Sequence, residues 1–137
     1  LGHSHPDKKS VFNYCESKKI NAKLIDSPED ISRYFSRLRF VISAGGLSAY
    51  EFASAGLPQL ITVLDSHQKN VAKMIKNNNC GQILVYANDI NKNKIVKKFI
   101  RFFFDQNKLR KQSRNAMKLI KNSGCDSIVD NLLKNVN

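Results

Sequence analysis

The residues best placed to bind a ligand are a glycine pair, Gly45-Gly46, between a predicted strand and a predicted helix. The apolar run 40–43 predicts a buried strand, residues 47–55 follow helical spacing, and a second apolar run at 60–64 predicts the next strand. Ligands of parallel α/β sheets bind where such a strand ends, because backbone N–H groups at the helix start can meet an anion and glycine allows close approach. The pair matches neither G-x-G-x-x-G nor a Walker loop. Spacing alone therefore leaves a ligand loop and a tight turn as equal alternatives.

Side chains near this pair would add contacts to a polar ligand. Ser48 offers a hydroxyl and an N–H group to a phosphate, and the Glu51 carboxylate can accept two hydrogen bonds from a ribose diol. His67, Gln68 and Asn70 open the next helix after the second strand ends, so the same topology puts them beside the pair as hydrogen-bonding groups. The competing interpretation is a plain turn residue for Ser48 and solvent exposure for the others. Taken singly, solvent exposure is as common for Glu51 and more common for the remaining three.

The sequence gives little support to metal or nucleophilic chemistry. His3 and His5 would share one side of an extended segment, but no third ligand completes a recognisable pattern. No Ser/His/Asp or Cys/His order indicates a nucleophile. We therefore expect no metal, no cofactor and no catalytic residue in this chain. Its three cysteines, Cys15, Cys80 and Cys125, are odd in number and widely spaced, which favours reduced thiols over disulfides.

Strand and helix signals alternate along the first two thirds of the chain, and only helical signals follow. Strands are expected at 22–25, 40–43, 60–64 and 82–86. Helices are expected at 8–19, from the start signal Ser27-Pro28-Glu29-Asp30 to residue 38, at 47–55, and from a cap at Asp65-Ser66 to residue 77. Three later helices are marked by apolar sets: Ile95, Val96, Phe99, Ile100 and Phe103; Leu109, Ser113, Ala116 and Ile120; Ile128, Val129, Leu132, Leu133 and Val136. The pattern predicts an α/β fold, a Rossmann-like parallel sheet flanked by helices with a helical C-terminus, as one domain over 1–137.

The charge of the chain is strongly positive, +12 over 137 residues, which favours anionic partners. Most of the excess lies on the last helices, at Lys92, Lys94, Lys97, Lys98, Arg101, Lys108, Arg110, Lys111, Arg114, Lys118 and Lys121. No RNP-like or helix-turn-helix pattern accompanies it, so nucleic acid is not the expected partner. No apolar run is long enough to cross a membrane. We expect a cytoplasmic protein with solvated basic helices; peripheral contact with a membrane surface or an acidic partner is the alternative.

The longer motifs resemble those of one family. Residues 1–6 resemble a G-S-S-N-P loop, 42–58 resembles the pattern I-S-A-G-G-x-T-x-x-E…G-x-P, and 67–70 resembles an N-Q element. Residues 124–131 resemble an L-x-D-G-x-G ending that has lost its later glycines. These motifs are similar to the C-terminal half of GT-B proteins of the family 28 type. The nearest resemblance is to the UDP-sugar hydrolases of pseudaminic acid synthesis and their spore-coat polysaccharide relatives, and a looser one is to the peptidoglycan N-acetylglucosaminyl transferase.

The resemblance implies roles for the candidate residues. Gly45, Gly46 and Ser48 would meet a UDP diphosphate, Glu51 would hold the ribose hydroxyls, and the backbone at Ile25 would contact the uracil edge. Gln68, with His67 and Asn70, would approach the diphosphate or the sugar. The implied nucleotide-binding set is Ile25, Ala44, Gly45, Gly46, Leu47, Ser48 and Glu51. Such folds work without a metal, because N–H groups stabilise the leaving UDP.

The chain also departs from the family pattern, because it lacks the N-terminal domain and the opening strand with its glycine loop. It is thus expected to be truncated at its N-terminus, to bind UDP or a UDP-sugar weakly alone, and to turn over only with the missing domain or a partner subunit. The leading hypothesis is the C-terminal half of a UDP-sugar hydrolase, which cleaves UDP from an amino-deoxy sugar in surface polysaccharide or flagellin glycan synthesis. Alternatives are the donor-binding half of a UDP-sugar glycosyltransferase, a subunit of a split transferase, or a non-catalytic basic module that binds polyanions.

Overall fold

The computed structural model describes residues 6–23, 25 and 29–120, which form two compact units divided between residues 34 and 35. The single domain over 1–137 stays a prediction. The expected helix at 126–136, with Cys125, and the pair His3 and His5 lie outside the described residues. Within the described part, no helix is long and apolar enough to cross a membrane.

The described part of the first unit contains the α-helix α1 (Lys8–Ser17), which confirms the predicted helix but ends two residues earlier. Asp7 precedes it without a side-chain capping bond, and the chain leaves the helix at Lys19, which has a φ of 52°. The strand predicted at 22–25 is wrong for its described residues, which are irregular. A strand needs a neighbour to satisfy its N–H and C=O groups, and no described strand pairs with this segment.

A 3₁₀ helix, η1 (Ser32–Arg37), replaces the α-helix predicted to run to residue 38. The Ser32 N–H donates to Asp30 Oδ1 at 2.8 Å, so this carboxylate starts the turn, while Ser27-Pro28 lies outside the described residues. Ile31 and Leu38, which would share one apolar face of an α-helix here, are exposed. The 3₁₀ helix has three residues per turn, so positions four and seven apart no longer share one face.

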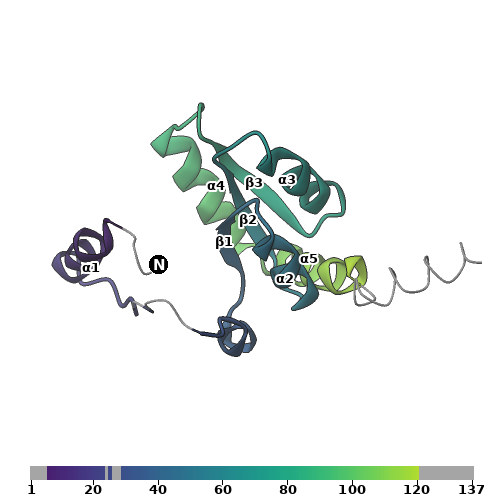
Figure 1. Ribbon diagram of the computed structural model, residues 1–137, viewed down its shortest axis with the longest axis horizontal. Coiled ribbons are helices and arrows are strands. Elements are labelled where there is room, and N and C mark those ends of the chain that lie inside the picture. The colour runs from purple at the N-terminus through teal and green to yellow at the C-terminus, as the bar shows by residue number, and fades with distance from the viewer. Residues whose placement is uncertain (1–5, 24, 26–28, 121–137) are drawn as a thin grey trace, which may run out of the picture. The chain divides into compact units, whose positions relative to one another are not determined.

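The second unit is built on three parallel strands, β1 (Val41–Ala44), β2 (Gln59–Val63) and β3 (Gly81–Tyr86), in the order β1-β2-β3 (Figure 1). Two helices, α2 (Ser48–Ser54) and α3 (Gln68–Asn77), follow the first two strands. These bounds lie within one or two residues of most of the predicted ones. The structure confirms the Rossmann-like α/β prediction.

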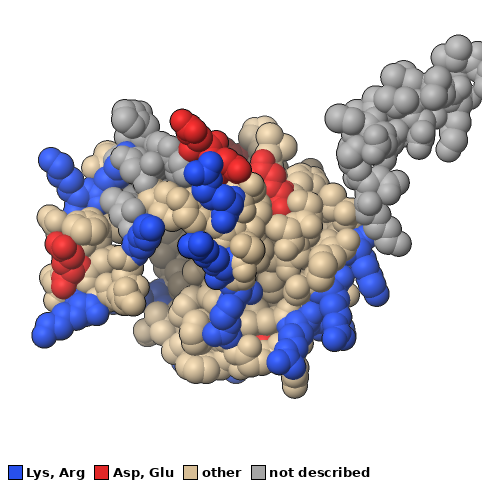
Figure 2. Space-filling model, turned by 90° about the horizontal axis from the view of Figure 1, so that it is seen from below, with Lys and Arg blue, Asp and Glu red and all other residues tan. Residues whose placement is uncertain are grey.

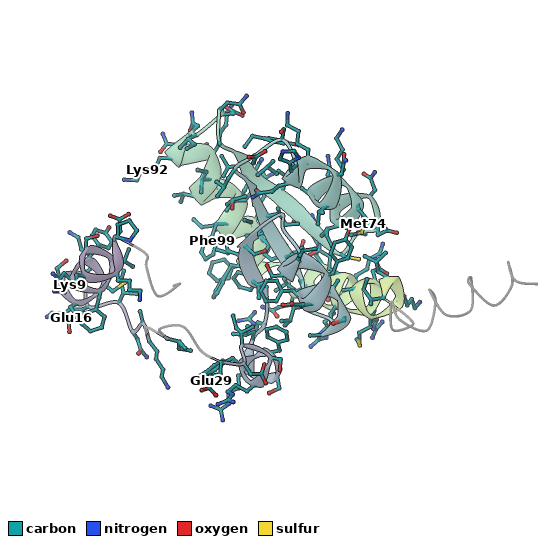
Figure 3. All side chains as sticks on the ribbon, in the orientation of Figure 1. Lys9, Glu16, Glu29, Met74, Lys92 and Phe99 are labelled. Atoms are coloured by element: carbon teal, nitrogen blue, oxygen red, sulfur yellow. The ribbon has the colours of Figure 1, made fainter. Side chains whose placement is uncertain are left out.

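Helices cover both faces of this sheet. On one face, α2 and α3 bury small and branched side chains: Ala49, Ala53, Ile61, Val63, Ala72, Ile75, Cys80 and Ala116. On the other face, α4 (Lys92–Phe104) packs its aromatic residues with Leu60 and Leu84. Met74 on α3 and Phe99 on α4 accordingly lie on opposite sides of the sheet (Figure 3). Helix α5 (Gln106–Leu119) contributes to both clusters, through Leu109 to the second and Ala116 to the first.

The buried face of α4 agrees with the predicted one in part, since Ile95 and Phe99 pack against the core. Phe102, absent from the predicted set, is almost fully buried, whereas Val96 and Ile100 are exposed. Phe102 is buried in one cluster with Leu60 and Leu84 of the sheet and Leu109 of α5. The Phe40 ring packs against Phe99, Phe102 and Phe103 at 6.1, 5.4 and 6.1 Å. The buried face of α4 thus depends on residues distant in sequence.

Candidate functional site

The glycine loop (residues 44–48) lies at the carboxyl end of β1, where the predicted site was placed. Gly45 is buried against the start of α3: a Cβ on it would lie 2.9 Å from the Gln68 carbonyl oxygen and 3.3 Å from Ile61 Cγ2. Only glycine fits such an approach without displacing backbone. The structure therefore brings together Gly45 and Gln68, which sequence topology placed side by side.

The next residue, Gly46, has open space where a side chain would project, with no heavy atom within 4 Å of an added Cβ. Leu47 beyond it is 83% exposed. The first N–H groups to find partners belong to Ala49 and Tyr50, which donate to the carbonyls of Gly46 and Leu47 at 3.1 and 3.0 Å. Among the described residues, the N–H groups of Gly46 and Leu47 donate to no backbone carbonyl. The loop is thus fixed at one glycine and open, with available donors, at the other.

Ser48 and Glu51 stand on the exposed side of α2, three residues apart and therefore on one helix face. The Glu51 carboxylate makes no ion pair or hydrogen bond with the rest of the described chain. Its negative charge would repel a phosphate, whereas it can accept hydrogen bonds from hydroxyl groups. The charges of these side chains thus agree with the predicted contacts, which are a phosphate for Ser48 and a diol for Glu51.

The β2–α3 turn is held by its own side chains. Asp65 Oδ1 accepts hydrogen bonds from the His67 N–H and the Ser66 hydroxyl, both at 3.0 Å, and these bonds lower the pKa of the Asp65 carboxyl below its ordinary value. Gln68 Oε1 accepts from the Leu64 N–H at 2.9 Å. The amide oxygen of Gln68 is therefore occupied, and its NH₂ group is the part left for a ligand.

The remaining candidates are less closely grouped. Asn70 is exposed and lies two residues after Gln68, a spacing that puts the two on different faces of α3. His67 is also exposed. Ile25 belongs to the first unit, and its contact with a uracil stays a prediction. No group of three or more His, Cys, Asp or Glu within the described ranges could hold a metal.

A hollow of about 170 Å³, which was not predicted from the sequence, lies at the carboxyl ends of β2 and β3. Its lining includes Lys69, Tyr86 and Asn88 as well as the Asp65-Ser66 turn. The predicted strand at 82–86 could have indicated this hollow, because its carboxyl end lies at the same edge of the sheet as those of the other two strands. Lys69 is the one cationic residue among those that line the hollow.

The parallel sheet, its covering helices and the loops at its carboxyl end define a Rossmann-like α/β domain. A family model described as the glycosyltransferase family 28 C-terminal domain matches residues 1–132 of this chain. The chain therefore belongs to the glycosyltransferase family 28 C-terminal domain family. No curated protein matches the sequence closely.

Proposed function

We propose that this chain binds the UDP part of a UDP-sugar and acts as the donor-binding domain of a glycosyltransferase. The observation that carries this proposal is the family match over residues 1–132, which includes the whole glycine loop. The geometry supports it, because the loop holds open N–H donors at the carboxyl end of the sheet, where nucleotides bind in such folds.

In this proposal the backbone of Ala44 to Leu47 and the Ser48 hydroxyl contact the diphosphate. Glu51 accepts hydrogen bonds from the ribose hydroxyls. The NH₂ group of Gln68 donates to a diphosphate or sugar oxygen, with His67 and Asn70 farther along the sugar. When UDP leaves, its growing negative charge is stabilised by donors already held in place.

Transfer is favoured over hydrolysis because the matched family is described as one of glycosyltransferases. The comparisons give no support to the hydrolase hypothesis. We assign no catalytic base to this chain; the base and the acceptor pocket are proposed to come from a further domain or a partner subunit. The chain alone is accordingly expected to bind UDP weakly and not to turn over.

Calorimetric titration with UDP, uridine and ADP tests the proposal. Glu51→Gln keeps the size of the side chain and removes its charge, and Glu16→Gln, on the exposed surface of α1, is the matched control. We expect Glu51→Gln to weaken UDP and uridine binding about tenfold, the effect of one charge-assisted hydrogen bond, and Glu16→Gln to leave both unchanged. Absence of UDP binding, or an equal effect of both substitutions, would contradict the proposal.

A further inference from the structure

A groove of about 480 Å³ lies at the opposite end of the sheet, between α5, the segment at 35–39 and the turn that precedes β2. Its floor is apolar and includes Phe35, Leu57 and Met117. Gly56, in the left-handed region with a φ of 68°, brings this turn against α5, since a Cβ on it would lie 2.8 Å from Met117 Cγ. The groove is therefore part of the packed framework of the unit.

Three arginines line this amino-end groove: Arg39, Arg110 and Arg114. The Arg39 guanidinium lies over the Phe103 ring, 5.2 Å from its centroid, so its position is held by a cation–π contact. Arg110 and Arg114 are one helical turn apart on α5. None of the three pairs with a carboxylate of the described chain.

The charge of the groove continues over the exposed face of α5, where Arg110, Lys111, Arg114 and Lys118 share one side of the helix. Figure 2 shows Lys and Arg side chains gathered on the side of the molecule where α5 lies. Helices α4 and α5 contain no acidic residue, and Asp105 between them is engaged in accepting from the Lys108 N–H as the cap of α5. The positive charge of this face is thus uncompensated.

Large apolar side chains stand exposed beside these cations. Met117 at the groove is 54% exposed. Phe104, which is 71% exposed, contacts Phe103 at a centroid distance of 5.0 Å. The Arg39 guanidinium lies over the ring of Phe103. Cations next to exposed apolar side chains are the pattern of a surface that meets lipid headgroups and the acyl boundary together.

We propose that this amino-end face, the groove with Phe104 and the basic side of α5, docks onto a bilayer surface that contains anionic phospholipids. The arginines and lysines contact lipid phosphates, and Met117 and Phe104 enter the interfacial region. A nucleic-acid duplex would match the charge, but its phosphate backbone would leave the apolar floor and Phe104 exposed to water. Because the glycine loop lies at the other end of the sheet, the docked chain keeps its donor site open.

Vesicle sedimentation of the full chain tests this proposal, with vesicles of phosphatidylcholine alone or with added phosphatidylglycerol. Arg110→Gln/Arg114→Gln removes two charges at the groove, and Lys92→Gln/Lys94→Gln removes two at the start of α4, which follows the carboxyl end of β3. Each cation removed from a docked surface lowers vesicle affinity about fivefold. We therefore expect the double substitution at the groove to lower binding to the anionic vesicles about 25-fold, and the control double substitution to lower it far less. Phe104→Ser should weaken binding with the charge unchanged.

Two further measurements keep the result decisive. Thermal unfolding of each variant by circular dichroism shows whether it is folded, and UDP titration shows whether the donor site is intact, since the two proposals are independent. Equal losses for both charge pairs, no effect of Phe104→Ser, or tighter binding to duplex DNA or single-stranded RNA than to anionic vesicles would overturn the proposal.

Discussion

The two ends of the β-sheet offer anion-binding groups of different kinds. At the carboxyl end, the glycine loop presents backbone N–H groups and neutral side chains, and the neighbouring elements carry both signs of charge, with Glu51 on α2 and Asp65 beside Lys69. At the amino end, the groove presents arginine side chains over an apolar floor. A fixed backbone can recognise one small anion at one position, whereas long flexible cations suit an extended anionic surface. Charge alone would have pointed to the wrong end of the sheet for a nucleotide.

Filling the space at Gly45 should have the largest effect on the carboxyl end of the sheet while leaving the amino end unchanged. Gly45→Ala places a Cβ 2.9 Å from a backbone carbonyl of α3, so the loop must move and its donors lose their alignment. We expect UDP affinity to fall more than tenfold and the free energy of unfolding to fall by about 1–3 kcal/mol, the usual cost of overpacking. Calorimetry and urea unfolding measure the two effects.

Gly46→Ala is the matched control, because an added Cβ there meets nothing within 4 Å. Its stability should stay close to that of the unchanged chain. Similar losses of stability for Gly45→Ala and Gly46→Ala would show that the contact between the loop and α3 is not what fixes Gly45.

At the amino end, Gly56→Ala tests the framework of the groove. Its φ of 68° disfavours any residue with a Cβ by roughly 1–2 kcal/mol, and Met117 must also shift. We expect lower stability and weaker binding to anionic vesicles, measured by urea unfolding and sedimentation, with UDP affinity unchanged. A loss of UDP affinity as large as that of Gly45→Ala would mean that the two ends are not separate.

Gln68→Glu separates support of the loop from ligand contact. The new carboxylate keeps an acceptor for the Leu64 N–H but loses the NH₂ donor and adds a negative charge. Stability should change by less than about 1 kcal/mol while UDP affinity falls severalfold. Gln68→Ala, which removes the acceptor as well, should lower both. Unchanged UDP affinity in Gln68→Glu would restrict this residue to a structural role.

The smallest effect concerns Asp65, because hydrogen bonds from the His67 N–H and the Ser66 hydroxyl lower the pKa of its carboxyl in the folded chain. A folded-state pKa below the unfolded value means that the stabilisation is full above about pH 4 and is lost as pH falls through the folded value. The stability difference between the unchanged chain and Asp65→Asn should therefore shrink from pH 6 to pH 3, as followed by urea unfolding. A stability difference that grows as the pH falls from about 6 to about 3 would contradict the lowered pKa of Asp65.

The sequence was sufficient to predict most of the second unit because its signals are local. Branched apolar runs predicted β1, β2 and β3, and the topology that follows from them correctly placed Gly45 beside Gln68. The burial of Phe102 on α4 was missed because it depends on Leu60, Leu84 and Leu109, which lie outside the helix. The bond from Leu64 to Gln68 and the hollow at Lys69 likewise depend on the exact path of a turn, which spacing does not encode.

The most direct test of the donor-site proposal is an NMR titration of the amide signals with UDP. The glycine loop predicts the largest shifts at the N–H groups of Gly45, Gly46, Leu47 and Ser48, with smaller shifts at the start of α3 and none along α5. UDP-induced shifts confined to the basic face of α5 would contradict the account, because they would mean that UDP is attracted by positive charge alone.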